Sequence, residues 1–499
     1  MAEPISEVVV VGGGIVGWSA AAALRRRLPA VRVTVVAYEP DPGALAERVV
    51  STLPSAIGFH QDIGLTEQDY ILNAGSVLRS GTRFTGWNGD AAPYVHAYAP
   101  HGQMLGGAHF HLAWIRARLE GCGGEAFDAY NMAAAAARQG LLVPPGADTG
   151  AAPAGAEFGL RIDPARYAYL LRAFALHLGA VERKAKPVDV TLRANDGFVE
   201  SVRLDDGSEA RGHLFIDCTG TAAAIRSRLG DKFEDWSRWL PCDRVAFAEA
   251  ATAAEPSPLD EAVAMPAGWR WQSAGAETTS LGYVYASQHL SDGDAARALH
   301  EACGAEPGTP VTLRQGRRPE PWLRNCVAIG DAAVCLEPLE WTNLHLAHSA
   351  IDRIVSMMPD RGCAPVELWD YNRQCGAEAD RVRDFLICHY AVSSQPEDPF
   401  WHTAAAAEPP ASLALTLTQF RERGRLPFFE EETFSRDSWL AILLGQGLMP
   451  RRSDPLADAV PAVEARRAME ALRRAIDAAL SKLPGQGAYL NHLARQSAR

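Results

Sequence analysis

Lysine is nearly absent from this chain of 499 residues. Of its 48 basic residues only four are lysines, and these are Lys184, Lys186, Lys232 and Lys482. The other basic residues are arginines, whose guanidinium groups stay protonated in proteins and have no free lone pair. A reaction that needs an amine must therefore use one of these four side chains.

Other absences exclude whole classes of protein. The net charge is −12 and no stripe of basic residues is present, so we expect no nucleic acid partner. The nine cysteines form no CxxC pair, which predicts reduced thiols in a cytoplasmic protein rather than a disulfide framework. The apolar stretch from Val8 to Leu24 is interrupted by glycines and lacks a positive leader, so we expect no targeting signal and no membrane contact.

The N-terminal segment has the pattern of a βαβ unit. A buried strand is predicted over residues 7–11, a helix over 18–28 and a second strand over 31–36. The first strand and the helix are joined by the loop Gly12-Gly13-Gly14-Ile15-Val16-Gly17. This order of strand, glycine loop, helix and strand predicts a Rossmann-like dinucleotide site.

The residues of this loop have separate expected tasks. Gly12 makes the tight turn, Gly14 lets the backbone approach a pyrophosphate, and Gly17 lets the helix pack on the sheet. Glu39 lies 22 residues after Gly17, where a carboxylate can accept hydrogen bonds from ribose hydroxyls. We therefore expect the cofactor to contact Gly12, Gly13, Gly14, Ile15, Gly17 and Glu39.

Two later segments indicate which dinucleotide binds. Residues 214–220 read as a buried strand that ends in Thr-Gly, and residues 326–329 as a strand that runs into Gly330-Asp331 and a new helix. An acid at the end of such a late strand can lie beside a ribityl chain, which favours FAD over NAD. The dinucleotide fold is then discontinuous, with substrate-side segments inserted between its parts.

The residues that carry a family resemblance are spread along the chain. Besides the glycine loop they are Asp217-Cys218-Thr219-Gly220, Gly268-Trp269-Arg270-Trp271, Gly282-Tyr283-Val284-Tyr285, Ile329-Gly330-Asp331-Ala332-Ala333, Leu336-Glu337-Pro338-Leu339-Glu340 and Ser438-Trp439-Leu440. In these motifs the chain resembles the flavin-dependent tryptophan halogenases, nearly from end to end. The resemblance implies reduced FAD as the cofactor, O2 as co-substrate and a separate flavin reductase.

The resemblance also implies the architecture. We expect an α/β fold with a discontinuous Rossmann-like FAD-binding module of the flavoprotein monooxygenase (PHBH-like) type, an inserted substrate-side sheet and a mostly helical C-terminal part. The FAD-binding parts are expected at 1–110, 201–235 and 321–360. The remaining segments are a linker with substrate-side residues at 111–200, the substrate-domain sheet with the Trp-x-Trp motif at 236–320, and the helical part at 361–499.

The departures from the family pattern bear on the reaction. The family places a lysine, whose amine delivers the halogen, at the position of Arg79. A guanidinium has no lone pair to become a chloramine, but it can orient a peroxide or stabilise an oxyanion. The alternative is that Arg79 forms an ion pair at the edge of the flavin.

Three further departures fall on other family motifs. Val49 and Val50 replace the glycine and glutamate of the segment that straps the flavin. Trp341-Thr342-Asn343 replaces Ser-Thr-Gly at the halide site, where the resemblance still implies that Thr342 and Asn343 contact the cofactor region. Residues 272–274 replace the end of the Trp-x-Trp-x-Ile-Pro motif.

These changes lead to the expected function, an FAD-dependent monooxygenase. Its flavin hydroperoxide would hydroxylate an aromatic ring, which we expect to be that of tryptophan. The substrate would be an aromatic small molecule, or a tryptophan in a protein or peptide that is modified during biogenesis of a tryptophylquinone cofactor. Arg79 and Glu340 are the expected catalytic residues, with Glu340 as the base or instead as a cap of the following helix. The alternatives are a halogenase with an unusual relay residue and a flavin-binding protein without activity.

Four further residues are expected at the substrate pocket or near the flavin: His96, His101, Trp269 and Trp271. His109 and His111 would face one side of a strand. Since no further ligands follow at a recognisable spacing, we expect no metal site.

Overall fold

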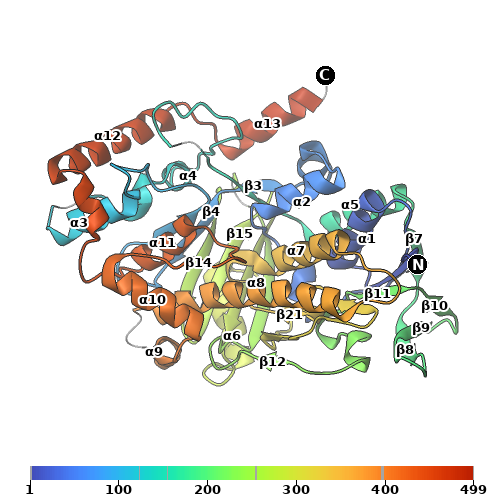
Figure 1. Ribbon diagram of the computed structural model, residues 1–499. Coiled ribbons are helices and arrows are strands. Elements are labelled where there is room, and N and C mark those ends of the chain that lie inside the picture. The colour runs from blue at the N-terminus through green and yellow to red at the C-terminus, as the bar shows by residue number, and fades with distance from the viewer. Residues whose placement is uncertain (1–2, 123, 154, 253–254, 395–397, 498–499) are drawn as a thin grey trace.

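The computed structural model describes residues 3–122, 124–153, 155–252, 255–394 and 398–497. Two sheets and a set of long helices are packed together, with the C-terminal helices covering much of one side (Figure 1).

The dinucleotide sheet has six strands in the order β19-β20-β11-β1-β2-β7. The strands β20, β11, β1, β2 and β7 run parallel, and the edge strand β19 is antiparallel. The strands are β1 (Glu7–Val11), β2 (Arg32–Ala37), β7 (Val181–Lys184), β11 (Leu214–Asp217), β19 (Trp322–Leu323) and β20 (Cys326–Ala328). Segments far apart in sequence therefore build one sheet, which confirms the predicted discontinuous α/β fold.

Helix α1 (Ile15–Arg27) packs on this sheet because its first ten residues are small or apolar and all of them are buried. It also contacts α5 (Pro164–His177) and α7 (Thr342–Ser356). The predicted strand, loop, helix and strand are thus confirmed. The expected helix after Gly330 is wrong, because only a three-residue 3-10 turn follows there and α7 begins at Thr342.

The second sheet has seven strands in the order β17-β13-β16-β15-β14-β4-β5. They are β4 (Gly81–Thr85), β5 (Tyr94–Ala97), β13 (Arg244–Ala251), β14 (Leu259–Met265), β15 (Gly268–Ala274), β16 (Thr278–Tyr285) and β17 (Val311–Thr312). In this sheet Thr82 is the register partner of both Asp260 and His96. Three polar side chains from distant segments thus come into one row across β14, β4 and β5.

Short sheets complete the β structure. Strand β3 (Val77–Arg79) pairs with β6 (Gly159–Arg161), so Arg79 lies opposite Gly159. The remaining strands are β8 (Pro187–Leu192), β9 (Val199–Leu204), β10 (Glu209–Arg211), β12 (Glu234–Asp235), β18 (Gly316–Arg317) and β21 (Val334–Cys335).

The part after residue 361 is helical, as predicted. It contains α8 (Pro365–Ala391), α9 (Pro399–Ala406), α10 (Ala411–Arg423), α11 (Arg436–Gly445), α12 (Ala462–Leu480) and α13 (Gln486–Ser497). The other helices are α2 (Ser55–Ile63), α3 (Phe110–Leu119), α4 (Met132–Ala137) and α6 (Asp292–Cys303). Among the described helices, none is both long and apolar enough to cross a bilayer.

The strand expected at His109 and His111 is wrong. His109 precedes α3 as its N-terminal flanking residue, and His111 lies in the first turn of that helix. The two rings are stacked with centroids 6.0 Å apart. Within the described ranges, no cluster of three or more His, Cys, Asp or Glu side chains is arranged to hold a metal ion.

Candidate active site

The glycine loop lies where the backbone leaves too little room for side chains. Gly12 has a φ of +132°, and a Cβ there would lie 2.4 Å from the carbonyl oxygen of Cys218 on the neighbouring strand. A Cβ on Gly17 would lie 2.0 Å from the carbonyl oxygen of Gly12. The loop therefore closes tightly between β1 and β11 and presents the N-terminus of α1 to a cavity of about 540 Å³.

The N-terminus of α1 already binds an anion, the carboxylate of Glu47. The amide of Val16 donates to Glu47 Oε1 at 3.2 Å, and the amide of Ile15 donates to Oε2. Burial raises the pKa of Glu47 to about 7, although the hydrogen bonds from Val16 and Ile15 oppose that shift. Because these amides and the helix dipole favour negative charge, the loop fits the pyrophosphate of a dinucleotide.

The other predicted cofactor residues differ in whether they line this cavity. Gly13, Gly14 and Ile15 line it. Asp331 is buried and accepts a hydrogen bond from the amide of Ala46 at 2.7 Å, and burial raises its pKa to about 6. Glu39 is exposed two residues after β2 ends, on the carboxyl side of the sheet where such cofactors bind.

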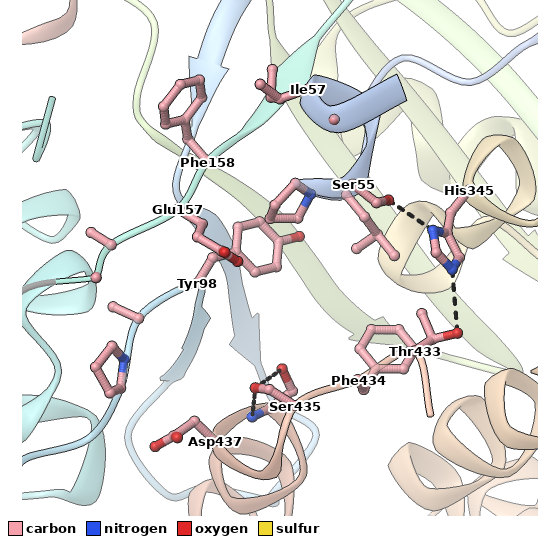
Figure 2. Close-up of a pocket in the computed structure, with 18 residues that line it drawn as sticks. Ser55, Ile57, Tyr98, Glu157, Phe158, His345, Thr433, Phe434, Ser435 and Asp437 are labelled. Carbon is pink, nitrogen blue, oxygen red and sulfur yellow. Dashed lines mark hydrogen bonds between the residues drawn. The ribbon is translucent and has the colours of Figure 1, made fainter. Parts of the chain in front are cut away.

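A second cavity of about 760 Å³ is lined by the start of α2, the residues after β5, residues 155–158 and the segment that leads into α11. Its walls are mainly apolar and aromatic, with Ile57, Phe158 and Phe434 among them (Figure 2). At one side Ser55 Oγ lies 2.7 Å from His345 Nδ1. Its size and apolar lining suit an aromatic ligand, and we refer to it as the substrate pocket.

Arg79 lies fully buried between the two cavities. Its Nε is 2.6 Å from a carboxylate oxygen of Asp260, and its other nitrogens donate to the Thr52 carbonyl at 3.1 Å and to Thr82 Oγ1 at 2.6 Å. A further hydrogen bond goes to the hydroxyl of Tyr98. The guanidinium is thus held in one place by three acceptor oxygens and by the charge of Asp260.

Asp260 is the counter-charge for two arginines. Besides Arg79 it accepts a hydrogen bond from Arg161 Nε at 2.6 Å and another from Ser273 Oγ at 2.7 Å. Burial opposes ionisation, but the charges of Arg161 and Arg79 hold the pKa of Asp260 below its ordinary value. Because Arg161 lines the first cavity and Tyr98 lines the second, a continuous polar chain crosses the wall between them.

Glu340 completes the buried cluster. Its Oε1 is 2.7 Å from His96 Nδ1 and 3.6 Å from His389 Nε2, and its Oε2 is 4.0 Å from Arg79. Burial opposes ionisation of Glu340, yet His96, His389 and Arg79 hold its pKa below the ordinary value. The carboxylate makes no capping bond to α7, so the capping alternative is wrong.

The backbone at Glu340 is strained. Glu340 and Trp341 have φ values of +60° and +59°, a left-handed conformation that costs non-glycine residues of order 1 kcal/mol each. Trp341 is buried and packs edge-to-face on Trp271, with ring centroids 5.6 Å apart. Strain of this kind persists where the surroundings fix it, and here it aims the Glu340 carboxylate at His96 and Arg79.

Some predicted site residues lie elsewhere. Neither Trp269 nor Trp271 lines either cavity, since both are buried on β15 and Trp269 Nε1 donates to Glu337 at 3.2 Å. His101 packs on Phe127 behind the pocket. These residues were expected at a pocket because of their place in the family pattern. His101 also contacts Asp437, which lines the second cavity, and a binding role for the three residues stays a prediction.

Thr342 and Asn343 are buried at the start of α7, and the side-chain amide of Asn343 donates to the Leu336 carbonyl at 2.8 Å. Neither lines the two cavities described.

Sequence reasoning missed Asp260, Arg161, Tyr98 and His389. All four are fully or almost fully buried against the predicted residues. The one available signal was that a buried Arg79 needs a carboxylate partner. That requirement predicts that the partner is a carboxylate but not which one, because the chain contains 60 acidic residues.

Comparisons with known proteins show which relatives and solved structures the chain resembles. BrvH, a flavin-dependent halogenase from Brevundimonas sp. BAL3, is 33% identical with a TM-score of 0.92, over 98% of this chain and 99% of that chain. Xcc4156, a flavin-dependent halogenase from Xanthomonas campestris, is 31% identical with a TM-score of 0.91, over 98% of each chain. Tryptophan 6-halogenase ThaL from Streptomyces albogriseolus is 26% identical over 91% of this chain and 92% of its own length. The family profile described as tryptophan halogenase matches residues 7–462, and the chain therefore belongs to the tryptophan halogenase family.

Proposed function

We propose that this protein is a flavin-dependent halogenase that acts on an indole or a similar electron-rich ring. The relatives with the highest identity above are described as flavin-dependent halogenases. When bound in the first cavity, reduced FAD would react with O2 and a halide and so supply hypohalous acid. A separate flavin reductase would supply the reduced flavin.

One observation carries the choice of reaction. The two cavities have no lining residue in common, and a buried chain of contacts from Tyr98 through Arg79 and Asp260 to Arg161 stands between them. Direct transfer of an oxygen atom requires the ring within a few ångströms of the flavin. A small oxidant that diffuses through the wall has no such requirement, and this supports halogenation over the hydroxylation expected from the sequence.

The cluster residues have distinct roles in this proposal. Arg79 is a fixed cation with no lone pair, so it would orient hypohalous acid by hydrogen bonds and charge rather than bind the halogen covalently. Glu340 remains ionised and would remove the ring proton after the halogen has added. His96 holds the carboxylate in place, and Tyr98 links Arg79 to the substrate pocket.

Hydroxylation of an aromatic ring, including a tryptophan within a peptide, is the second candidate. Two observations favour it. The position of the family's lysine holds Arg79, and the motif associated with halide holds the buried Trp341 and the side chain of Asn343. Both changes would weaken halogen delivery and leave the oxygen that bound reduced FAD would activate free to react with a ring.

The deciding experiment supplies the protein with FAD, a flavin reductase and NADH, and offers indole with bromide, with chloride or with neither halide. We expect a brominated or chlorinated product that disappears without halide. Replacement of Glu340 by Gln should lower kcat about 100-fold or more, as loss of a general base does. Glu261→Gln, which alters a half-exposed carboxylate on β14, is the matched control and should keep its activity.

A product that gains one oxygen from ¹⁸O2 without any need for halide would replace this proposal with the second candidate. In that case Arg79→Lys, which restores an amine, should create halide-dependent product. If neither a halogenated nor a hydroxylated product forms with any of several indoles and phenols, the hypothesis of a flavin-binding protein without activity would gain support.

A further inference from the structure

The substrate pocket carries negative charge on two sides. Glu157 is exposed to the pocket, and in the described chain its carboxylate has neither an ion-pair partner nor a hydrogen bond. Asp437, on the first turn of α11, is partly exposed with 31% of its side chain accessible. Figure 2 shows both acids on the pocket wall, Glu157 beside Tyr98 and Asp437 near Ser435.

Neither acid is neutralised by an arginine or lysine of the pocket. Among the described lining residues there is no arginine and no lysine. Asp437 Oδ1 accepts hydrogen bonds from the His101 amide at 2.7 Å and from His101 Nδ1 at 3.0 Å. Burial opposes ionisation of Asp437, but these contacts with His101 hold its pKa below the ordinary value, so it stays charged at neutral pH. The adjacent Arg436 turns away and contacts the ring of His109.

Two helix N-termini also face the pocket, and each could attract an anion. Some of the amides at each of these ends are already paired. At α11 the Ser435 hydroxyl accepts from the amide of Ser438, and Asp437 adds a negative charge in the first turn. At α2 the amides of Ala56 and Ile57 donate to the carbonyls of Leu53 and Pro54. A ligand carboxylate would therefore meet two acids, and the amides of Ser438, Ala56 and Ile57 are not free to bind it.

From this arrangement we infer that the pocket selects indoles that bear a protonated amine and no free carboxylate. The apolar walls would hold the ring, and Glu157 and Asp437 would attract the ammonium group. Free tryptophan, with its carboxylate, would be disfavoured. The inference rests on the proposed function only in taking this cavity as the substrate site.

The test is a binding measurement that requires no reduced flavin and no halide. The affinities of L-tryptophanamide and L-tryptophan are compared by calorimetry at about pH 6, where an α-amino group is protonated. The two ligands differ only in a carboxamide against a carboxylate. We expect the amide to bind roughly fivefold tighter than tryptophan. Interactions of a ligand charge with two partly exposed carboxylates have about this effect on affinity. Salt should reduce the difference because it screens such charges.

A second pair of ligands and two variants localise the effect. Tryptamine should bind more tightly than indole-3-propionate, and Glu157→Gln should reduce both preferences. Glu301→Gln, which removes an exposed carboxylate on α6 outside the pocket, should leave both unchanged. The inference would be overturned if tryptophan bound as tightly as its amide, or if Glu157→Gln left the preference for the amine ligands unchanged. Failure of all four ligands to bind would also overturn it.

The outcome is separable from that of the proposed function. If the affinities follow the expected order but no halide-dependent product forms, only the reaction has been misassigned. If halogenation occurs and tryptophan is the best ligand, only the inferred substrate class is wrong.

Discussion

At the scale of single residues, Asp260 is the side chain on which the centre depends. It is the shared counter-charge of Arg79 and Arg161, and all three side chains are at most 1% exposed. Two buried guanidinium groups next to each other would be strongly unfavourable without it. Neither Asp260 nor Arg161 is conspicuous in the sequence, since each lies in a short strand among 108 charged residues.

Replacement of Asp260 by Asn should therefore destabilise the protein by about 3–5 kcal/mol, the cost of breaking a buried ion pair by removing one partner. Urea denaturation of the two proteins measures the difference. The pKa of Asp260 is lowered, so its stabilising effect is present above the ordinary aspartate pKa and is lost as pH falls through the lower folded value. The wild-type advantage over the variant should accordingly shrink in acid.

The neighbouring residue on the same strand provides the control. Glu261 pairs with Arg83 at 3.2 Å, and both side chains are about 30% exposed. Glu261→Gln should cost less than about 1 kcal/mol, as partly exposed ion pairs do. Equal losses for Asp260→Asn and Glu261→Gln would mean that the buried network is not held by its charges.

At the scale of elements, local patterns were predictable and register was not. The first strand, glycine loop, helix and second strand could be predicted because each depends on neighbours within about 30 residues. The row of Asp260, Thr82 and His96 depends on how β14, β4 and β5 align, and nothing local specifies that alignment. The same limit explains His109 and His111, where alternation suggested a strand and the structure has the start of α3.

The N-terminus of α1 yields a prediction about pH. The pKa of Glu47 is raised to about 7, so the folded protein holds this proton more tightly than the unfolded chain does. The stability that comes from this proton is complete below the ordinary glutamate pKa and is lost as pH rises through about 7. Glu47→Gln should remove this loss, and its stability relative to wild type should rise by about 1–3 kcal/mol between pH 5 and pH 8.

Thermal or urea unfolding of both proteins across that pH range measures this difference. Glu7→Gln serves as the control because Glu7 forms an ion pair with the exposed Arg32 at the amino ends of β1 and β2 in the same sheet. Its stability difference from wild type should not change between the two pH values. A Glu47→Gln variant that loses stability as pH rises, relative to wild type, would show that the carboxylate is not held against the helix as described.

At the scale of the whole molecule, the centre is assembled from segments that are distant in sequence. Arg79, Asp260 and Glu340 come from β3, β14 and the turn before α7, and substrate-pocket residues come from α2 and the segment before α11. Single residues of this set were predictable from their resemblance to family motifs. Their partners were not, because a contact across more than 100 residues leaves no periodic or spacing signal in one sequence.

The last two helices contribute to this assembly. Helices α12 and α13 return along the side of the molecule toward α3, α4 and β3 (Figure 1). Ile476, Met469 and Leu480 of α12 are buried. At the start of α13 the Gln486 side chain donates to the carbonyl of Leu78 at 3.0 Å, directly before Arg79. The C-terminal end of the chain thus supports the strand that carries the central cation.

Deletion of all residues after Pro461 should therefore lower stability by at least about 3 kcal/mol, because three large apolar side chains lose their burial. It should also weaken the binding of indole ligands, since the Leu78 carbonyl loses its donor and β3 loses its support. Deletion after residue 494 removes the exposed end of α13 and is the control that should change neither property. Calorimetric unfolding and ligand titration of the two truncated proteins measure both effects. If the longer deletion unfolds like the full chain and binds indoles equally well, the C-terminal helices do not support the site.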